Sequence, residues 1–123
     1  MFSRNSEKLE SLIGLNSSFK GEIDTKGTIR IDGSLTGNVK ADWVILGEKA
    51  ILKGDITARG IVIGGRVDGN LIAQEIIEIK PKGQVFGDIS TKKLTIMEGG
   101  FFEGKSTMIR EDSKVVEFNV KSV

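Results

Sequence analysis

Six polar side chains, each directly after one of six regularly spaced glycines, are the residues whose types and spacing could bind a metal ion. They are Glu22, Asn38, Asp55, Asn70, Asp88 and Lys105. Carboxylate and amide oxygens are ligands that Ca²⁺ and Mg²⁺ prefer. An amide separates the two aspartates, so Asp55 and Asp88 should lie two strand spacings, or roughly 10 Å, apart in a stacked structure. Because alternating acids and amides avoid repulsion between stacked neighbours, we favour a solvated ladder over a metal site.

Other catalytic or ligand-binding chemistry finds little support in the sequence. Histidine and cysteine are both absent, which removes the commonest general base, the commonest metal ligand and thiolate chemistry. Gly64-Gly65-Arg66 lacks the strand–loop–helix setting of a phosphate-binding loop. The net charge is +1, and no basic patch is interleaved with aromatic residues. We therefore expect no enzymatic activity, no cofactor, no metal, no nucleotide and no nucleic-acid partner.

Length and composition predict one soluble intracellular domain. The chain has 123 residues, which is enough for a single core. No apolar run approaches the roughly 20 residues of a membrane helix, and no signal-peptide pattern begins the chain. The absence of cysteine fits a reducing compartment.

An internal repeat positions the polar ladder. The block G-S-L-T-G-N-V (33–39) recurs at 50–56, 65–71 and 83–89, with weaker copies at 17–23 and 100–106. All six copies keep the central glycine, and the steps between these glycines are 16, 17, 15, 18 and 17 residues. The six glycines are Gly21, Gly37, Gly54, Gly69, Gly87 and Gly104.

The positions on either side of each glycine form columns of small or aliphatic residues. Two residues before the glycine are Phe19, Leu35, Leu52, Val67, Val85 and Phe102, and two after it are Ile23, Val39, Ile56, Leu71, Ile89 and Ser106. An upstream pair such as Ile29 and Ile31 completes each copy. The residues between these columns are mostly polar, which is the period-two pattern of strands with one buried face.

A period of about 17 residues that keeps the period-two pattern throughout predicts a parallel β-helix. Residues 29–41 alternate through two glycines without a change of phase. In a β-helix each winding pairs with its neighbours at about 4.8 Å, so six windings would stack to roughly 29 Å. We interpret the glycine column as a corner where an inward Cβ would not fit.

Two other architectures explain the repeat less well. A sandwich would place turn signals about every 8–12 residues, but this does not explain a glycine at one place in six copies. A left-handed β-helix, as in hexapeptide-repeat acyltransferases, would need a period of six, and those enzymes usually use a catalytic histidine. Parallel crossovers are right-handed, so we expect an all-β, right-handed β-helix of about six windings with a triangular cross-section.

The repeat also resembles one family. Segments such as F-K-G-E-I (19–23), R-I-D-G-S-L-T-G-N-V (30–39) and G-G-R-V-D-G-N-L (64–71) closely resemble the bactofilins, and the resemblance covers residues 12 to about 108. It implies a bacterial cytoskeletal protein that polymerises end to end without nucleotide, as a homopolymer whose like ends meet. It also implies filaments at the inner face of the cytoplasmic membrane, where they scaffold cell-wall enzymes or organise cell shape.

The two ends of the β-helix are the predicted polymer interface. The terminal copies contain the phenylalanines of their column, Phe19 and Phe102, and a sheet end left open invites pairing with another chain. We expect these rings to face the ends and to bury against a neighbouring subunit, together with Ile13, Ile96 and Phe101. The alternative is that each ring only plugs a tapering end.

The chain is predicted to have three parts: an N-terminal segment over 1–10, the β-helix over 11–109 and a C-terminal tail over 110–123. Met1, Phe2 and Arg4 resemble the membrane-targeting start of many bactofilins, whereas Glu7 and Glu10 favour a disordered start instead. Residues 116–120 alternate apolar and polar, so a further strand that caps the last winding is the alternative to a mobile tail.

The function predicted from these patterns is a non-enzymatic, self-assembling scaffold. The alternative is a monomeric or dimeric β-helix that binds a cell-wall polymer or enzyme through a side face. An outward apolar pair, Ile45 above Val62, is open to two interpretations: it is covered by a terminal segment, or it makes lateral contacts between filaments.

Overall fold

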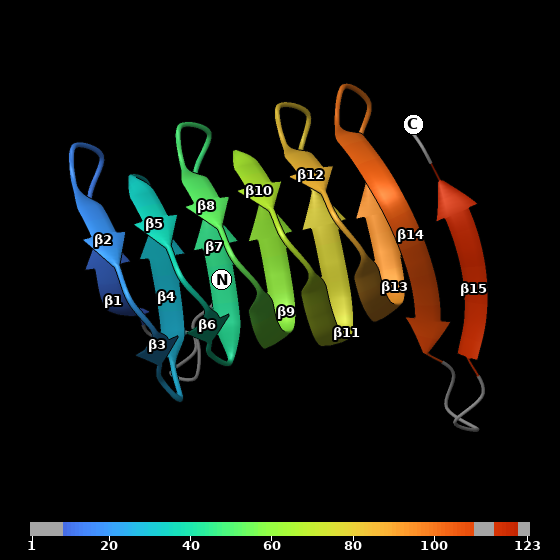
Figure 1. The fold of residues 1–123 in the computed structure, drawn as a ribbon, viewed down its shortest axis with the longest axis horizontal. Helices are drawn as coiled ribbons and strands as arrows, with labels where there is room; N and C mark the ends of the chain where they lie inside the picture. Colours follow the sequence, from blue (N-terminus) through green and yellow to red (C-terminus); the bar gives the residue numbers. More distant parts are fainter. Residues whose placement is uncertain (1–8, 110–114, 121–123) are drawn as a thin grey trace.

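The chain folds into a single stack of parallel strands, shown by a computed structural model that describes residues 9–109 and 115–120. For residues 9–11 and 115–120 only the backbone is described. The described part is all-β, and no helix in it is long and apolar enough to cross a membrane. Six windings follow one another along the long axis (Figure 1). The right-handed parallel β-helix predicted from the repeat is confirmed.

The strands are short because each winding turns three corners. Windings one to three contain β1 (Leu9–Ile13), β2 (Ser18–Lys20), β3 (Ile23–Asp24), β4 (Thr28–Ile31), β5 (Ser34–Thr36), β6 (Val39–Lys40), β7 (Trp43–Leu46), β8 (Ile51–Lys53) and the start of β9 (Ile56–Ile63). Windings four to six contain the rest of β9, β10 (Arg66–Asp68), β11 (Leu71–Ile79), β12 (Gln84–Phe86), β13 (Ile89–Ile96) and β14 (Phe101–Ile109). The strand β15 (Val115–Val120) follows the last winding.

Three faces surround the core, and each is an in-register parallel sheet. The first face contains β1, β4, β7, the second halves of β9 and β11, and the end of β13; the second contains β2, β5, β8, β10, β12 and the start of β14. The third contains β3, β6, the first halves of β9, β11 and β13, and the end of β14. The register pairs Val67 with Leu52 on one side and with Val85 on the other, as the repeat columns predict.

The core consists of the inward columns. Ile29, Ile61 and Ile77 are completely buried on the first face, as are Leu52 and Val67 on the second. Each such side chain contributes about 1.5–3 kcal/mol relative to exposure. The third face has two inward columns: one of larger side chains, namely Val39, Ile56, Leu71 and Ile89, and one of smaller side chains, namely Ala41, Ala58, Ala73 and Thr91.

The six repeat glycines lie at the corner between the second and third faces, with φ between +140° and +155°. L-residues rarely adopt such φ values, whereas glycine does so without penalty. A Cβ at Gly69 would collide with the carbonyl oxygen of Gly54, the equivalent glycine one winding earlier. The obstruction therefore lies along the stack, between adjacent windings, and not inside the core as predicted from the repeat.

Turns of two lengths occur at the corner between the first and second faces. Four-residue turns at 14–17, 47–50, 80–83 and 97–100 are each closed by a backbone hydrogen bond, as from the Ala50 N–H to the Gly47 carbonyl at 3.0 Å. We call these the long turns, and they project at one edge of the stack (Figure 1). Windings two and four have short turns instead, at 32–33 and 64–65.

The C-terminal segment differs in part from its prediction. A tail was expected over 110–123, but β15 pairs antiparallel with β14, from Ile109 opposite Val115 to Gly104 opposite Val120. The alternative of one further strand is therefore the one observed. Its apolar–polar alternation is the signal that favours a strand over a mobile chain.

Candidate assembly surfaces at the ends of the β-helix

The N-terminal end leaves strand edges unpaired. Within the described residues β1, β2 and β3 each pair on one side only, with β4, β5 and β6. Their other edges present N–H and C=O groups that an added strand could satisfy. This end therefore has the chemistry of an unfinished sheet.

Apolar side chains are exposed at the same end. Phe19 is 37% exposed and Leu15 is 55% exposed, whereas Leu35, one winding further in, is 1% exposed. Ile13 and Ile23 are half-buried. The Phe19 ring lies 3.5 Å from the position of a Cβ on Gly21. Phe19 and Ile13 thus lie at an end of the core that no other strand of the described residues covers, and their contact with a neighbouring subunit stays a prediction.

The C-terminal end is closed differently, and one predicted interface residue is corrected there. Phe102 is completely buried, because its column points inward and its ring fills the end of the core next to Val85. The alternative that the ring plugs the end is therefore observed for Phe102, and the prediction of an accessible ring is wrong. Ile96 and Phe101 are half-buried, and their contact with a neighbouring subunit stays a prediction.

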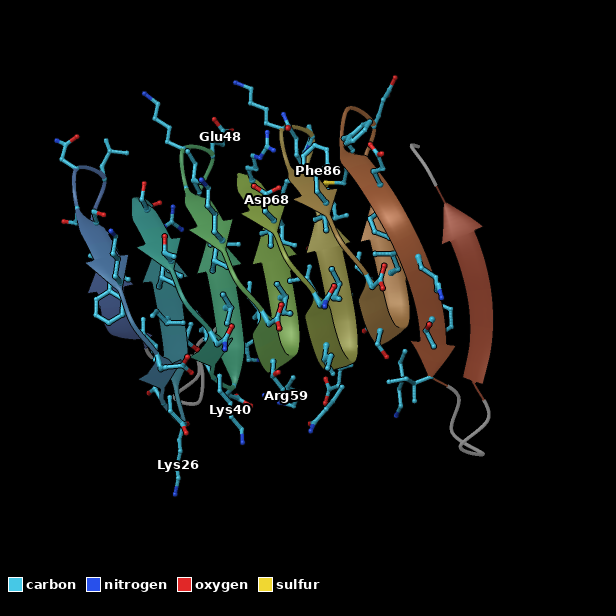
Figure 2. All side chains as sticks on the ribbon, viewed as in Figure 1. Lys26, Lys40, Glu48, Arg59, Asp68 and Phe86 are labelled. Carbon is cyan, nitrogen blue, oxygen red and sulfur yellow. The ribbon has the colours of Figure 1, made fainter. Side chains whose placement is uncertain are left out.

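An aromatic cluster on the second face was not predicted. The rings of Phe86 and Phe101 are tilted by 44° with centroids 5.4 Å apart, and the Arg66 guanidinium lies 4.4 Å from the Phe86 centroid. Arg66 also pairs with Asp68 at 3.2 Å, and Figure 2 shows Asp68 and Phe86 toward the edge where the long turns project. Phe86, Phe101, Lys82, Gln84 and Gly99 line an open groove of about 530 Å³. The alignment of the repeats could have revealed this cluster, since it places the two rings on adjacent windings.

The polar ladder links successive windings through hydrogen bonds. The backbone N–H of Asn70 donates to Asp55 Oδ1 at 2.9 Å, and that of Asp88 donates to Asn70 Oδ1 at 3.1 Å. The same contact joins Asp55 to Asn38 and Lys105 to Asp88. No group of three or more acidic side chains within the described ranges is arranged to hold a metal ion. Asn and Asp recur here because their short side chains reach the next winding's N–H.

A second unpredicted cluster lies where the third face meets the first. Arg59 donates to both carboxylate oxygens of Asp42, at 2.9 and 3.0 Å, and to Glu75 at 3.3 Å (its position is labelled in Figure 2). These hydrogen bonds from Arg59 hold the pKa of Asp42 below its usual value, and the two carboxylates raise the pKa of Arg59. The guanidinium lies 5.8 Å from the ring centroid of Trp43, which covers Gly60.

The predicted membrane-contact residues Met1, Phe2 and Arg4 lie outside the described residues. Their role stays a prediction.

Comparison with known proteins agrees with a stack of parallel windings. A family model described as "Bactofilin: Polymer-forming cytoskeletal" matches residues 11–107. Bactofilin BacO of Myxococcus xanthus (strain DK1622) is 29% identical over 99 residues, covering 80% of this chain and 79% of that protein. Bactofilin BacP of the same organism is 27% identical over 88 residues; the match covers 72% of this chain but only 35% of BacP.

The fold also matches a solved structure, a cryo-EM reconstruction of Thermus thermophilus bactofilin double helical filaments. The TM-score is 0.71 at 24% identity, and the match covers 79% of this chain and 97% of the other. The class that the fold defines is a small all-β solenoid built from in-register parallel windings. The chain belongs to the bactofilin family, whose members are polymer-forming cytoskeletal proteins.

Proposed function

We propose that this chain is a bacterial cytoskeletal scaffold subunit that assembles end to end into filaments without nucleotide. The observation that carries this proposal is the N-terminal end, where three strand edges without a partner among the described residues surround apolar side chains at the end of the core. A second copy could continue the sheets and cover Phe19 and Leu15. Burial of each such side chain stabilises by about 1.5–3 kcal/mol, and edge pairing adds backbone hydrogen bonds.

Contact between like ends is favoured over head-to-tail stacking. A head-to-tail copy would place its β3 beside the end of β14, but β15 already occupies that edge in the antiparallel direction. Isologous contacts, N-terminal end to N-terminal end and C-terminal end to C-terminal end, avoid this conflict. The resulting filament has no polarity.

The cellular setting follows from the family and from the predicted N-terminal contact. Met1, Phe2 and Arg4 would bind a bilayer weakly in one subunit, but a polymer presents many copies and avidity strengthens the contact. A filament at the inner face of the cytoplasmic membrane can position cell-wall enzymes and organise cell shape. In this role the chain is a scaffold and performs no catalysis itself.

The second candidate function is a monomeric or dimeric binding module. The groove lined by Phe86 and Phe101 favours it, because exposed aromatic rings with a nearby arginine are typical of binding surfaces. In that case the side face would bind a cell-wall polymer or enzyme, and the ends would stay free.

Negative-stain electron microscopy of the purified chain in EDTA, without nucleotide, tests the proposal. We expect filaments from the unmodified chain. Phe19→Arg should place a charge in the N-terminal contact and leave dimers that are joined at their C-terminal ends. Light scattering would measure the mass of these particles. Monomers from this variant would instead indicate head-to-tail stacking.

Ile51→Arg is the matched control. Ile51 is exposed to 42%, much as Phe19 is, but it lies in the third winding on a side face. This variant should form normal filaments. Monomers from the unmodified chain would overturn the scaffold proposal and favour the binding module.

A further inference from the structure

The outward column on the first face has an order of side chains that suits a second copy. Strand register aligns one residue from each winding, in the order Leu12, Arg30, Ile45, Val62, Glu78 and Thr95. The apolar pair Ile45 and Val62 lies at the centre of the six windings. A base and an acid, Arg30 and Glu78, flank this pair at equal distances. The column is thus nearly self-complementary when its direction is reversed.

We propose that the first face pairs laterally with the first face of a second copy, about a two-fold axis parallel to the strands. This operation reverses the stack, so the third winding of one copy faces the fourth winding of the other. Ile45 then packs on Val62 of the second copy, and Arg30 lies opposite Glu78 of the second copy. Each contact occurs twice, as an isologous interface requires.

The charges of the two flanking residues are available for this contact. Among the described residues Glu78 makes no ion pair, and its side chain is half-buried. Arg30 pairs with Asp32 of its own winding at 3.0 and 3.1 Å. A guanidinium has five N–H donors, so Arg30 can bind a second carboxylate while it keeps Asp32.

The order of long and short turns in the four central windings fits the same register. Reversal of the stack places the long turn 47–50 opposite the short turn 64–65 of the second copy, and the long turn 80–83 opposite the short turn 32–33. Projections therefore meet gaps in the four central windings, at the edge where the long turns project (Figure 1). In the two outer windings the long turns 14–17 and 97–100 face each other. The turns of the four central windings are thus compatible with the arrangement that the charges favour.

A groove on the first face lies where the second copy's turn would enter. Its volume is about 270 Å³, and it lies over Gly64 between the long turns of the third and fifth windings. Ile45 and Val62 line it together with Glu48, Lys80 and Pro81. In the reversed arrangement this groove faces turn 47–50 of the second copy.

The arrangement with parallel stacks is disfavoured by the same column. It would place Arg30 opposite Arg30 and Glu78 opposite Glu78, and like charges in direct apposition are destabilising. The apolar pair alone does not distinguish the two arrangements, so the flanking charges decide between them.

The contact area that the first face of one subunit offers is small. A stack of roughly 29 Å and a four-residue strand of about 13 Å give on the order of 380 Å² per copy, against about 800 Å² for a stable interface. A single pair would therefore be short-lived. Repetition along two filaments multiplies the contact, so lateral pairing should depend on polymerisation or on high protein concentration.

A zero-length cross-link tests the register. Arg30→Lys keeps the positive charge and provides an amine that a water-soluble carbodiimide can join to a carboxylate. Residues 30 and 78 lie three windings, or roughly 14 Å, apart within one chain, which such a link cannot span. End-to-end contacts do not bring them together either. We expect a cross-linked peptide that joins the new amine at position 30 to Glu78. In a mixture of ¹⁴N and ¹⁵N protein, part of this peptide should contain one ¹⁴N half and one ¹⁵N half, which shows that the link joins two chains.

Arg66→Lys is the matched control. Arg66 makes the same pair with the aspartate two residues later, at 3.2 and 3.3 Å, but it lies on the second face. Carbodiimide should produce no comparable link between chains at residue 66.

Charge reversal gives a second test, read as the fraction of filaments that lie in pairs in electron micrographs. Arg30→Glu and Glu78→Arg should each reduce paired filaments several-fold, and the double variant or a mixture of the two single variants should restore them. Absence of the link between position 30 and Glu78, or a double variant no better than the single ones, overturns the proposal. The cross-link can be read in concentrated protein without filaments, so failure of end-to-end assembly and failure of lateral pairing are distinguishable.

Discussion

At the scale of single residues, the corner glycines determine how closely the windings approach. Gly69 has a φ of +155°, and a Cβ there would collide with the Gly54 carbonyl. Neither the backbone angle nor the space suits an L-residue. The repeat identifies these glycines without a structure, but the direction of the missing Cβ depends on the stacking of two windings.

Replacement of Gly69 by alanine should therefore separate adjacent windings. Strained backbone of this kind costs about 1–3 kcal/mol before any collision is added. We expect the free energy of unfolding to fall by at least that amount in urea titrations followed by circular dichroism. Gly14→Ala is the control, since a Cβ there meets only the Ser17 hydroxyl, at 3.7 Å; equal losses in the two variants would contradict this explanation.

The pair between Arg59 and Asp42 gives a pH dependence with a definite sign. Because the pKa of Asp42 is lowered in the folded chain from 3.8, its contribution to stability is present above that value. The contribution is lost as pH falls through the lower, folded value. The difference in unfolding midpoint between the unmodified chain and Asp42→Asn should therefore shrink as pH falls below about 4. Arg59→Gln should remove the same pH-dependent part of the stability. A difference in unfolding midpoint between the unmodified chain and Asp42→Asn that grows in acid would contradict this explanation.

At the scale of strands, the sequence predicts the inward columns and their register well. Each column follows from a period of two within a strand and a period near 17 between windings, and both are local patterns. Trp43 and Arg59 illustrate what remained unpredicted, because their contact joins two windings through outward side chains. Outward positions tolerate many residue types, so the pattern does not reveal which of them touch.

The last winding shows another limit of the sequence pattern. Phe19 and Phe102 occupy the same column, yet Phe19 is exposed and Phe102 is fully buried. The two ends differ because β1, β2 and β3 are the first strands of the stack, whereas β15 continues the sheet beyond β14. A column alone does not distinguish a side chain that plugs an end from one that extends a surface.

Truncation of the two adjacent phenylalanines in β14 should separate their roles. Phe102→Ala leaves a cavity in the core and should lower the free energy of unfolding by about 3–5 kcal/mol. Phe101 is half-buried and points outward, so Phe101→Ala should cost much less. Thermal unfolding of both variants measures the difference, and similar losses would contradict the burial of Phe102 in the isolated chain.

At the scale of the whole molecule, the stack has two unequal ends and one charge-ordered side. Among the described residues, the N-terminal end has unpaired strand edges and exposed apolar side chains, whereas the other end is plugged by Phe102 and flanked by β15. End contacts would set the filament axis along the stack, because the unpaired strand edges face along that axis. Pairing of first faces would then join two such filaments side by side.

The most direct test of end-to-end assembly is the axial structure of the unmodified filament, measured by cryo-EM. The account predicts a layer spacing of about 4.8 Å along the filament axis and an advance of about 29 Å per subunit from its six windings. The extra layer at the β15 end adds slightly to the advance per subunit. Successive subunits should alternate in direction along the filament. Strands that run parallel to the filament axis would contradict end-to-end assembly. Subunits that all point the same way would contradict contact through like ends.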